Sequence, residues 1–147
     1  MTLFFTIRWP LRAVASLCVV LIGFSVSAKA EDVFRLMLEE PIDGEIHGGV
    51  GNLRGWAVAS EGIEKVEIFI DGEYAFDAPY GGARGDVGGA FSEVPNADQS
   101  GFSSAYAYSL LSSGTHSIAA VAHTRAGTTK ESAATFEVVK FKQAFIS

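Results

Sequence analysis

Residues 63–78 read IEKVEIFIDGEYAFDA, and this stretch decides the class of fold. Within it, Val66, Ile68 and Ile70 occupy every second position, which is the period of a strand with one buried face. The next two residues are Asp-Gly, a dipeptide that predicts a tight hairpin because its primed turn requires positive φ angles. The stretch therefore predicts two antiparallel strands joined by a two-residue turn.

Short segments of similar character recur on both sides of this hairpin, separated by turns that contain glycine. Long windows with the apolar spacing of a helix do not occur among them. Seven strands are expected, over residues 33–38, 50–59, 63–70, 73–78, 101–109, 115–124 and 130–141. About seven short strands in a chain segment of about 110 residues predict an all-β fold, an antiparallel β-sandwich of two packed sheets.

The first thirty residues differ in composition from the rest. Arg8 and Arg12 precede an apolar run over residues 13–28, and Ala28-Lys29-Ala30 matches the small-x-small pattern of a cleavage site. A basic segment, an apolar run and such a site are the parts of a secretory signal peptide. A membrane anchor is the alternative, but a spanning helix needs about 20 apolar residues, and this run is shorter and broken by serines.

We therefore expect residues 1–30 to be a cleavable signal peptide and residues 31–147 to form a single domain that is secreted or periplasmic. The whole chain has 11 Lys and Arg against 17 Asp and Glu, and three basic residues but no acidic ones fall before residue 31. Residues 31–147 then carry eight basic and 17 acidic residues, a formal net charge of −9. This charge disfavours nucleic acid and anionic lipid as partners. The one cysteine, Cys18, also precedes residue 31, so the domain must be stabilised without disulfides.

An ordered set of short motifs extends over residues 41–139: Pro41-x-x-Gly44, Gly55-Trp56-Ala57, Ile63-x-x-Val66-x-Ile68-x-x-Asp71-Gly72, Arg84-x-Asp86-Val87, Pro95-Asn96, Ser100-Gly101-Phe102 and Leu111-x-x-Gly114-x-His116. In this order the motifs resemble those of bacterial Ig-like domains. The resemblance implies an immunoglobulin-like antiparallel β-sandwich of about seven strands. It also implies a module of a secreted or surface protein that serves as a spacer, adhesion unit or binding platform rather than as a catalyst.

The longest expected connection covers residues 79–100, far more than the usual loop of about 4–6 residues. Its candidate binding residues are Tyr80, Arg84, Asp86 and Phe91, of which tyrosine and arginine are typical of binding hot spots. The alternative is a loop that belongs to the fold, packs Phe91 inward and pairs Arg84 with Asp86 or with a backbone carbonyl.

Other residues suggest further chemistry. Asp86, Asn96 and Asp98 could supply oxygen ligands to Ca²⁺, although their spacing is not that of an EF-hand, and a solvated acidic loop is the alternative. Trp56 is expected either in the core or as an exposed ring that stacks on a sugar.

The three histidines, His47, His116 and His123, show no arrangement that predicts catalysis or metal binding. His116 and His123 are an odd number of residues apart, so on one strand they would face opposite sides of the sheet. We therefore expect a protein that is not an enzyme and has no cofactor.

Two functions remain open from the sequence. The first is a binding or adhesion module that contacts a protein or an envelope glycan through residues 79–100. The second is a structural or assembly module whose edge strand pairs with another chain, with residues 33–38 or the tail 140–147 as that edge. No membrane span is expected after processing, and the oligomeric state is left open.

Overall fold

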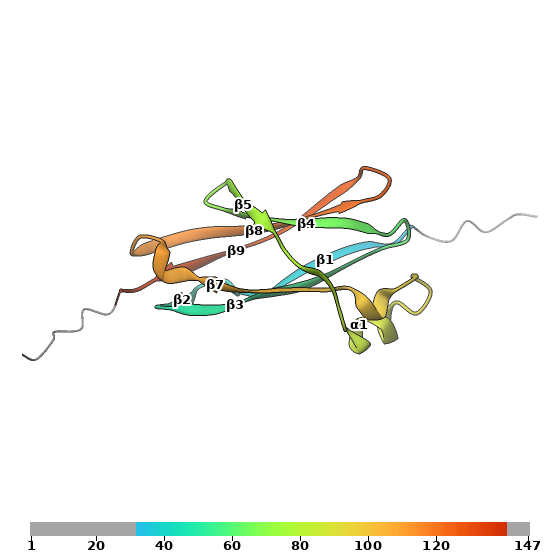
Figure 1. Ribbon diagram of the computed structural model, residues 1–147, viewed down its shortest axis with the longest axis horizontal. Helices are drawn as coiled ribbons and strands as arrows, with labels where there is room; N and C mark the ends of the chain where they lie inside the picture. The colour runs from blue at the N-terminus through green and yellow to red at the C-terminus, as the bar shows by residue number, and fades with distance from the viewer. Residues whose placement is uncertain (1–31, 141–147) are drawn as a thin grey trace, which may run out of the picture. The chain divides into compact units, whose positions relative to one another are not determined.

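The computed structural model describes residues 32–140, which form two β-sheets packed face to face (Figure 1). The predicted signal peptide and the last seven residues of the tail lie outside these residues. The described strands are β1 (Phe34–Glu40), β2 (Glu45–His47), β3 (Val50–Ala59), β4 (Ile63–Ile70), β5 (Glu73–Asp77), β6 (Tyr80–Gly82), β7 (Gly101–Ala107), β8 (Gly114–Thr124) and β9 (Thr129–Val138). One short helix, α1 (Gly85–Ala90), and two 3₁₀ turns, η1 (Ala97–Gln99) and η2 (Tyr108–Leu110), complete the described elements.

The first sheet has the order β1-β3-β7-β6 and the second the order β2-β9-β8-β4-β5. Neighbouring strands are antiparallel except β2 and β9, which run parallel. The predicted all-β sandwich is confirmed, but with nine described strands rather than about seven. The two additional strands, β2 and β6, have three residues each, and such short segments show no periodicity that could predict them.

The hairpin expected at residues 63–78 forms as predicted. Ile70 pairs with Glu73, and the two turn residues Asp71 and Gly72 have φ angles of 52° and 82°. Both angles are positive, as a primed two-residue turn requires. The alternation in β4 is also confirmed, because Val66, Ile68 and Ile70 are buried between the sheets while the intervening side chains point outward.

The main core lies between the two sheets. It contains side chains from both, and the largest completely buried ones are Phe102, Tyr108, Phe136, Leu53 and Ile68. Tyr108 is buried together with its hydroxyl group, which donates a hydrogen bond to the carbonyl of Asn52 at 2.9 Å. A buried phenol needs such a partner, so the core retains one polar group without leaving it unpaired.

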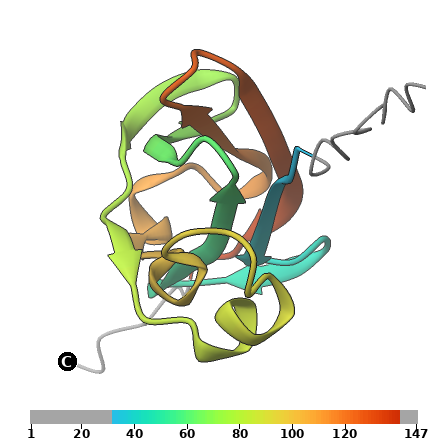
Figure 2. The same ribbon diagram turned by 90° about the vertical axis from the view of Figure 1, so that its right-hand side faces the viewer.

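A second, smaller cluster covers part of the outer face of the first sheet. Residues 83–100, here called the cover segment, contain α1 and η1, and Figure 2 shows them at one end of the sandwich, outside the sheets. Val87, Val94 and Ala97 of this segment bury Val58 of β3. Beside this cluster, Trp56 packs on Phe91, with ring centroids 5.7 Å apart. Trp56 therefore lies neither in the main core nor fully exposed, because Phe91 covers it.

The helices within residues 32–140 are too short to cross a membrane.

Candidate functional site

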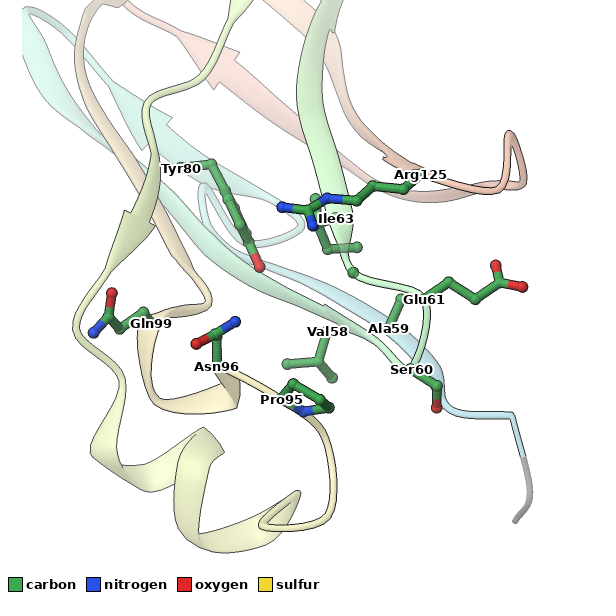
Figure 3. A pocket seen from close by; sticks show the side chains of 11 residues that line it. Val58, Ala59, Ser60, Glu61, Ile63, Tyr80, Pro95, Asn96, Gln99 and Arg125 are labelled. Carbon is green, nitrogen blue, oxygen red and sulfur yellow. The ribbon is translucent and has the colours of Figure 1, made fainter. Parts of the chain in front are cut away.

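The cover segment and two turns of the sandwich enclose a pocket of about 290 Å³, here called the end pocket (Figure 3). Its walls come from four parts of the chain: the β3–β4 turn, the start of β6, η1 with the residues before it, and the β8–β9 turn. The polar side chains that line it are Ser60, Glu61, Tyr80, Asn96, Gln99 and Arg125. Three of these six residues belong to the 79–100 connection that the sequence singled out.

One wall of the end pocket is formed by two turns that are bonded to each other. The backbone N–H of Arg125 donates to the carbonyl of Gly62 at 3.1 Å, and the N–H of Gly62 donates to the carbonyl of Ala59 at 2.9 Å. Gly62 has a φ angle of 80°, a conformation that favours glycine, and the Arg125 side chain lies against it. These contacts hold the start of the Arg125 side chain at the rim.

Another wall of the end pocket carries the aromatic ring of Tyr80, which has a fixed orientation. Tyr80 is half-buried, and its hydroxyl donates to the carbonyl of Ala57 at 2.8 Å. Burial raises the pKa of Tyr80, while the positive charge of Arg125 acts in the opposite direction. Figure 3 shows the Arg125 guanidinium beside this ring, with the amides of Asn96 and Gln99 below it.

Several polar side chains around the end pocket have no hydrogen-bonding partner among residues 32–140. The guanidinium of Arg125 and the side-chain amides of Asn96 and Gln99 form no hydrogen bond with any residue in the range 32–140. Asn96 also holds a left-handed backbone conformation, with φ 60° and ψ 24°. A non-glycine residue in this conformation is uncommon, and such residues cluster at functional sites. The end pocket thus offers unpaired donors and acceptors beside a held ring.

The residues predicted from sequence are divided among three places. Tyr80 lines the end pocket, whereas Phe91 packs on Trp56 in the second cluster. Arg84 and Asp86 line a separate groove of about 490 Å³ on the outer face of the first sheet. The four candidate residues therefore do not form one binding surface.

Arg84 is held by two carboxylates. Its Nη1 and Nη2 donate to the two oxygens of Glu39 at 3.0 and 2.9 Å, and its Nε and Nη2 donate to Asp86 at 2.8 and 2.7 Å. The pairing with Asp86 matches the structural alternative stated above, and Glu39 of β1 is a partner that the sequence did not indicate. The Arg84 guanidinium holds the pKa of Asp86 well below its usual range.

The calcium prediction gains no support from this arrangement. The carboxylate of Asp86 is taken by Arg84, while Asn96 lines the end pocket. Within residues 32–140, no three or more His, Cys, Asp and Glu side chains come together in a way that could hold a metal ion.

His116 lies between a serine and an aspartate, as in a hydrolase triad. Its Nδ1 is 2.6 Å from Oδ2 of Asp71, and its Nε2 is 3.3 Å from Oγ of Ser112. However, Nε2 is also 3.0 Å from the carbonyl oxygen of Ser112, which can only accept a hydrogen bond. Contacts to a carboxylate and a carbonyl require protons on both ring nitrogens, so this histidine is suited to be a cation and not a general base.

The contact between His116 and Asp71 predicts a pH-dependent stability. The hydrogen bond to Asp71 raises the pKa of His116, although burial opposes it. Burial acts to raise the pKa of Asp71, but the Ser117 N–H and His116 together lower it. The His116 contribution is complete below its unfolded pKa of about 6.5 and is lost as the pH rises through the raised folded value. The Asp71 contribution is present above about pH 4 and is lost as the pH falls through the lowered folded value.

We therefore expect the free energy of unfolding to be higher near pH 6 than near pH 8, as measured by urea denaturation. His116→Gln and Asp71→Asn should each flatten this part of the profile, because either change removes the charged pair. A slope that persists unchanged in both variants would show that another group causes it.

The sequence could not indicate the remaining side chains of the end pocket. Glu61 and Arg125 stand in turns that read as ordinary solvated connections, and Gln99 has no motif around it. The fold brings these three residues together from positions up to 64 apart in the chain.

Comparison with known proteins gives the class of fold. No protein-family model matches the chain, and no curated protein matches it. Among solved structures it is similar to the endo-β-1,4-mannanase from Thermotoga petrophila, with a TM-score of 0.53, 15% identity and coverage of 80% of this chain and 22% of that one. It is also similar to the fibronectin(III)-like modules of Clostridium thermocellum CbhA, with a TM-score of 0.50, 14% identity and coverage of 76% and 50%.

A third similar structure is CopC from Methylosinus trichosporium OB3b, with a TM-score of 0.45, 13% identity and coverage of 77% of this chain and all of that one. The chain thus spans about a fifth of the mannanase and half of the CbhA structure. At these identities the likeness shows the fold alone. The fold is a β-sandwich similar to that of fibronectin-III-like modules, consistent with the immunoglobulin-like architecture expected from the motifs.

Proposed function

We propose that the chain is a non-enzymatic binding module that holds a sugar unit of a glycan in the end pocket. Residues 1–30 serve as its signal peptide, and the module acts in the periplasm or outside the cell. The observation that carries the proposal is the set of unpaired amide and guanidinium groups beside the held ring of Tyr80.

A sugar matches this set of groups in two ways. Its hydroxyl groups both donate and accept, as the amides of Asn96 and Gln99 do, and the guanidinium of Arg125 adds several donors in one plane. Its C–H face is apolar and can lie against an aromatic ring, while the ring of Tyr80 loses little entropy because its hydroxyl is already bonded. The charges of Glu61 and Arg125 balance, which favours a neutral ligand over a strongly charged one.

The size of the end pocket is also suitable. Its volume of about 290 Å³ is just below the range of roughly 300–1,000 Å³ that small-molecule sites occupy, which is enough for one sugar unit but not for several. One unit of a polymer could enter from the open end of the sandwich while its neighbours remain in solvent.

Two of the four edge strands, β1 and β5, have features that disfavour assembly by strand pairing. β1 does lie at an edge, but Lys130 donates to the carbonyl of Phe34 at 2.8 Å, and the N–H of Leu38 donates to Oγ of Ser132 at 3.1 Å. Side chains of β9 thus occupy backbone groups that another chain would need. The edge strand β5 has a register shift opposite Ile68 and Phe69 and carries acidic residues, features that discourage edge pairing.

We expect Asn96→Gly and Arg125→Gln each to weaken glycan binding by about tenfold or more, which corresponds to about 1.4 kcal/mol. Glycine keeps the positive φ angle of residue 96 while removing the amide, so the fold should be unaffected. Affinity electrophoresis of the protein against a panel of soluble neutral and acidic polysaccharides measures the effect.

Asn52→Ala provides the control, because Asn52 is exposed on β3 and does not line the end pocket. The same polysaccharides should release no reducing ends on incubation with the protein. If no polysaccharide retards the protein, or if both pocket variants bind as the unchanged protein does, the glycan proposal is wrong.

A further inference from the structure

The outer faces of the two sheets differ in how far other described segments cover their side chains. On the first sheet, the cover segment buries Val58 and packs on Trp56. On the second sheet, Phe69 of β4 also points outward, but its aromatic neighbour is Tyr74, which is itself 55% exposed, with ring centroids 5.9 Å apart. No element of residues 32–140 covers this aromatic pair in the way that the cover segment covers Trp56.

Beside Phe69 lies a shallow apolar groove of about 350 Å³, here called the outer groove. It follows β8 and is lined by Phe69, Ser117, Ala119, Val121, Glu131 and Ala133. The cross-strand register places Phe69 beside Ala119, and Ala119 beside Ala133. The floor of the outer groove thus consists of small side chains with one aromatic wall, so another backbone could approach the sheet closely.

The charged side chain that lines the outer groove, Glu131, is acidic. The register aligns Asp77, Glu67, Val121 and Glu131 in one row across β5, β4, β8 and β9. Glu67 is already paired with Lys65 and His123, so its charge is compensated. Glu131 is exposed and forms no ion pair with any residue between 32 and 140. A partner at this groove would therefore gain by placing a basic group at Glu131.

The position of the groove on a sheet face limits what kind of segment can occupy it. An extended segment laid on the face cannot form backbone hydrogen bonds with the sheet, so its N–H and C=O groups that are buried against the apolar floor would lack partners. A helix satisfies its backbone internally and needs only an apolar stripe to dock. Within residues 32–140, another copy of the chain offers no such helix, since α1 has six residues. The formal net charge of the chain, −6, also makes self-association repulsive.

From this geometry we propose that the outer groove is a docking surface for a basic amphipathic helix of a partner protein. The apolar stripe of the helix lies along β8 against Phe69, Ala119 and Ala133. A lysine or arginine beside the stripe pairs with Glu131. This surface is separate from the end pocket, whose walls come from other parts of the fold, and the inference does not depend on glycan binding.

The test uses the full chain and a fluorescent 18-residue peptide of leucine and lysine patterned as an amphipathic helix. Two peptides serve as controls: one has the same composition with leucine at every second position, and the other has glutamate in place of lysine. Fluorescence anisotropy should show saturable binding of the helical lysine peptide and at least tenfold weaker binding of both controls. Equal binding of the two lysine peptides would overturn the proposal, because it would mean attraction by charge alone.

Variants of the protein locate the surface. Ala119→Gln and Ala133→Gln should each reduce affinity by about tenfold, and Glu131→Gln should reduce it severalfold and make binding less dependent on salt. Glu137→Gln is the matched control, since Glu137 is also exposed on β9 but does not line the outer groove. Amide chemical shifts should change along β8 and β9. Binding that is absent, or that is the same in all four variants, would show that the outer groove is not a docking surface.

Discussion

Replacing Gly55 by alanine is expected to remove a large part of the stability of the protein. Gly55 lies in β3 between two partner strands, opposite Leu38 of β1 and Phe102 of β7. A Cβ atom at this position would be 2.1 Å from the carbonyl oxygen of Met37 and 2.5 Å from Cζ of Phe102. Neither neighbour can yield easily, because one is backbone within a paired strand and the other is a completely buried ring.

The expected loss is about 3 kcal/mol or more, the upper range for overpacking a core. A domain of this size has a total stability of roughly 5–15 kcal/mol, so Gly55→Ala should shift the urea midpoint strongly or prevent folding. Gly49→Ala is the matched control, because a Cβ there meets no atom within 4 Å. It should change stability by less than about 0.5 kcal/mol. Equal midpoints for the two variants would mean that β1 and β7 can move apart at little cost.

The parts of the fold that follow local rules could be predicted from sequence. The hairpin at Asp71 and Gly72 depends on two adjacent residues and on the alternation of β4, and all of this information is local. The outward position of Glu137 between the buried Phe136 and Val138 follows in the same way. Such local consistency was enough to give the class of fold.

The cover segment could not be predicted, for a physical reason. Its helix α1 reads GDVGGA, and three glycines in six residues give no helical preference. The segment is held instead by tertiary contacts, with Val87 and Val94 against Val58 and the Gly88 backbone close to Asp98. A Cβ at residue 88 would be 2.7 Å from Cβ of Asp98, so the glycine that weakens the helix also permits its packing.

The candidate site was predicted only in part because its residues come from distant turns. Tyr80 and Asn96 were singled out within residues 79–100, but Asn96 was considered as a calcium ligand. Arg125 reaches the end pocket only because the β8–β9 turn bonds to the β3–β4 turn through Gly62. Proximity of this kind is created by the sandwich and leaves no local pattern.

Replacing Arg84 by methionine is expected to loosen the cover segment from the first sheet. Arg84 is 19% exposed, and its guanidinium bonds to Glu39 of β1, 45 residues away, as well as to Asp86. Its backbone N–H donates to the carbonyl of Asp98 at 2.7 Å. In the sequence Asp98 stands between Asn96 and Gln99, which line the end pocket. Methionine keeps a similar stem over Gly101, where the Arg84 Cγ lies, and removes the guanidinium with its charge and its hydrogen bonds.

The expected cost is about 2 kcal/mol, because hydrogen bonds to charged groups are strong and Glu39 is left without its partner. Arg54→Met is the matched control. Arg54 pairs with Glu40 at 3.0 Å but is 54% exposed, so its loss should cost less than about 1 kcal/mol. Urea denaturation measures both variants.

The Arg84 variant also has an expected pH signature. In the folded protein Arg84 lowers the pKa of Asp86, so this pair adds stability above the unfolded aspartate value of about 4 and loses it as the pH falls. Arg84→Met should therefore lose less stability on acidification than the unchanged protein does. Because the cover segment supplies Asn96 and Gln99 to the end pocket, the variant should also bind glycan more weakly, whereas Arg54→Met should not. Loss of stability with glycan affinity intact would show that Arg84 holds the segment without positioning the pocket wall.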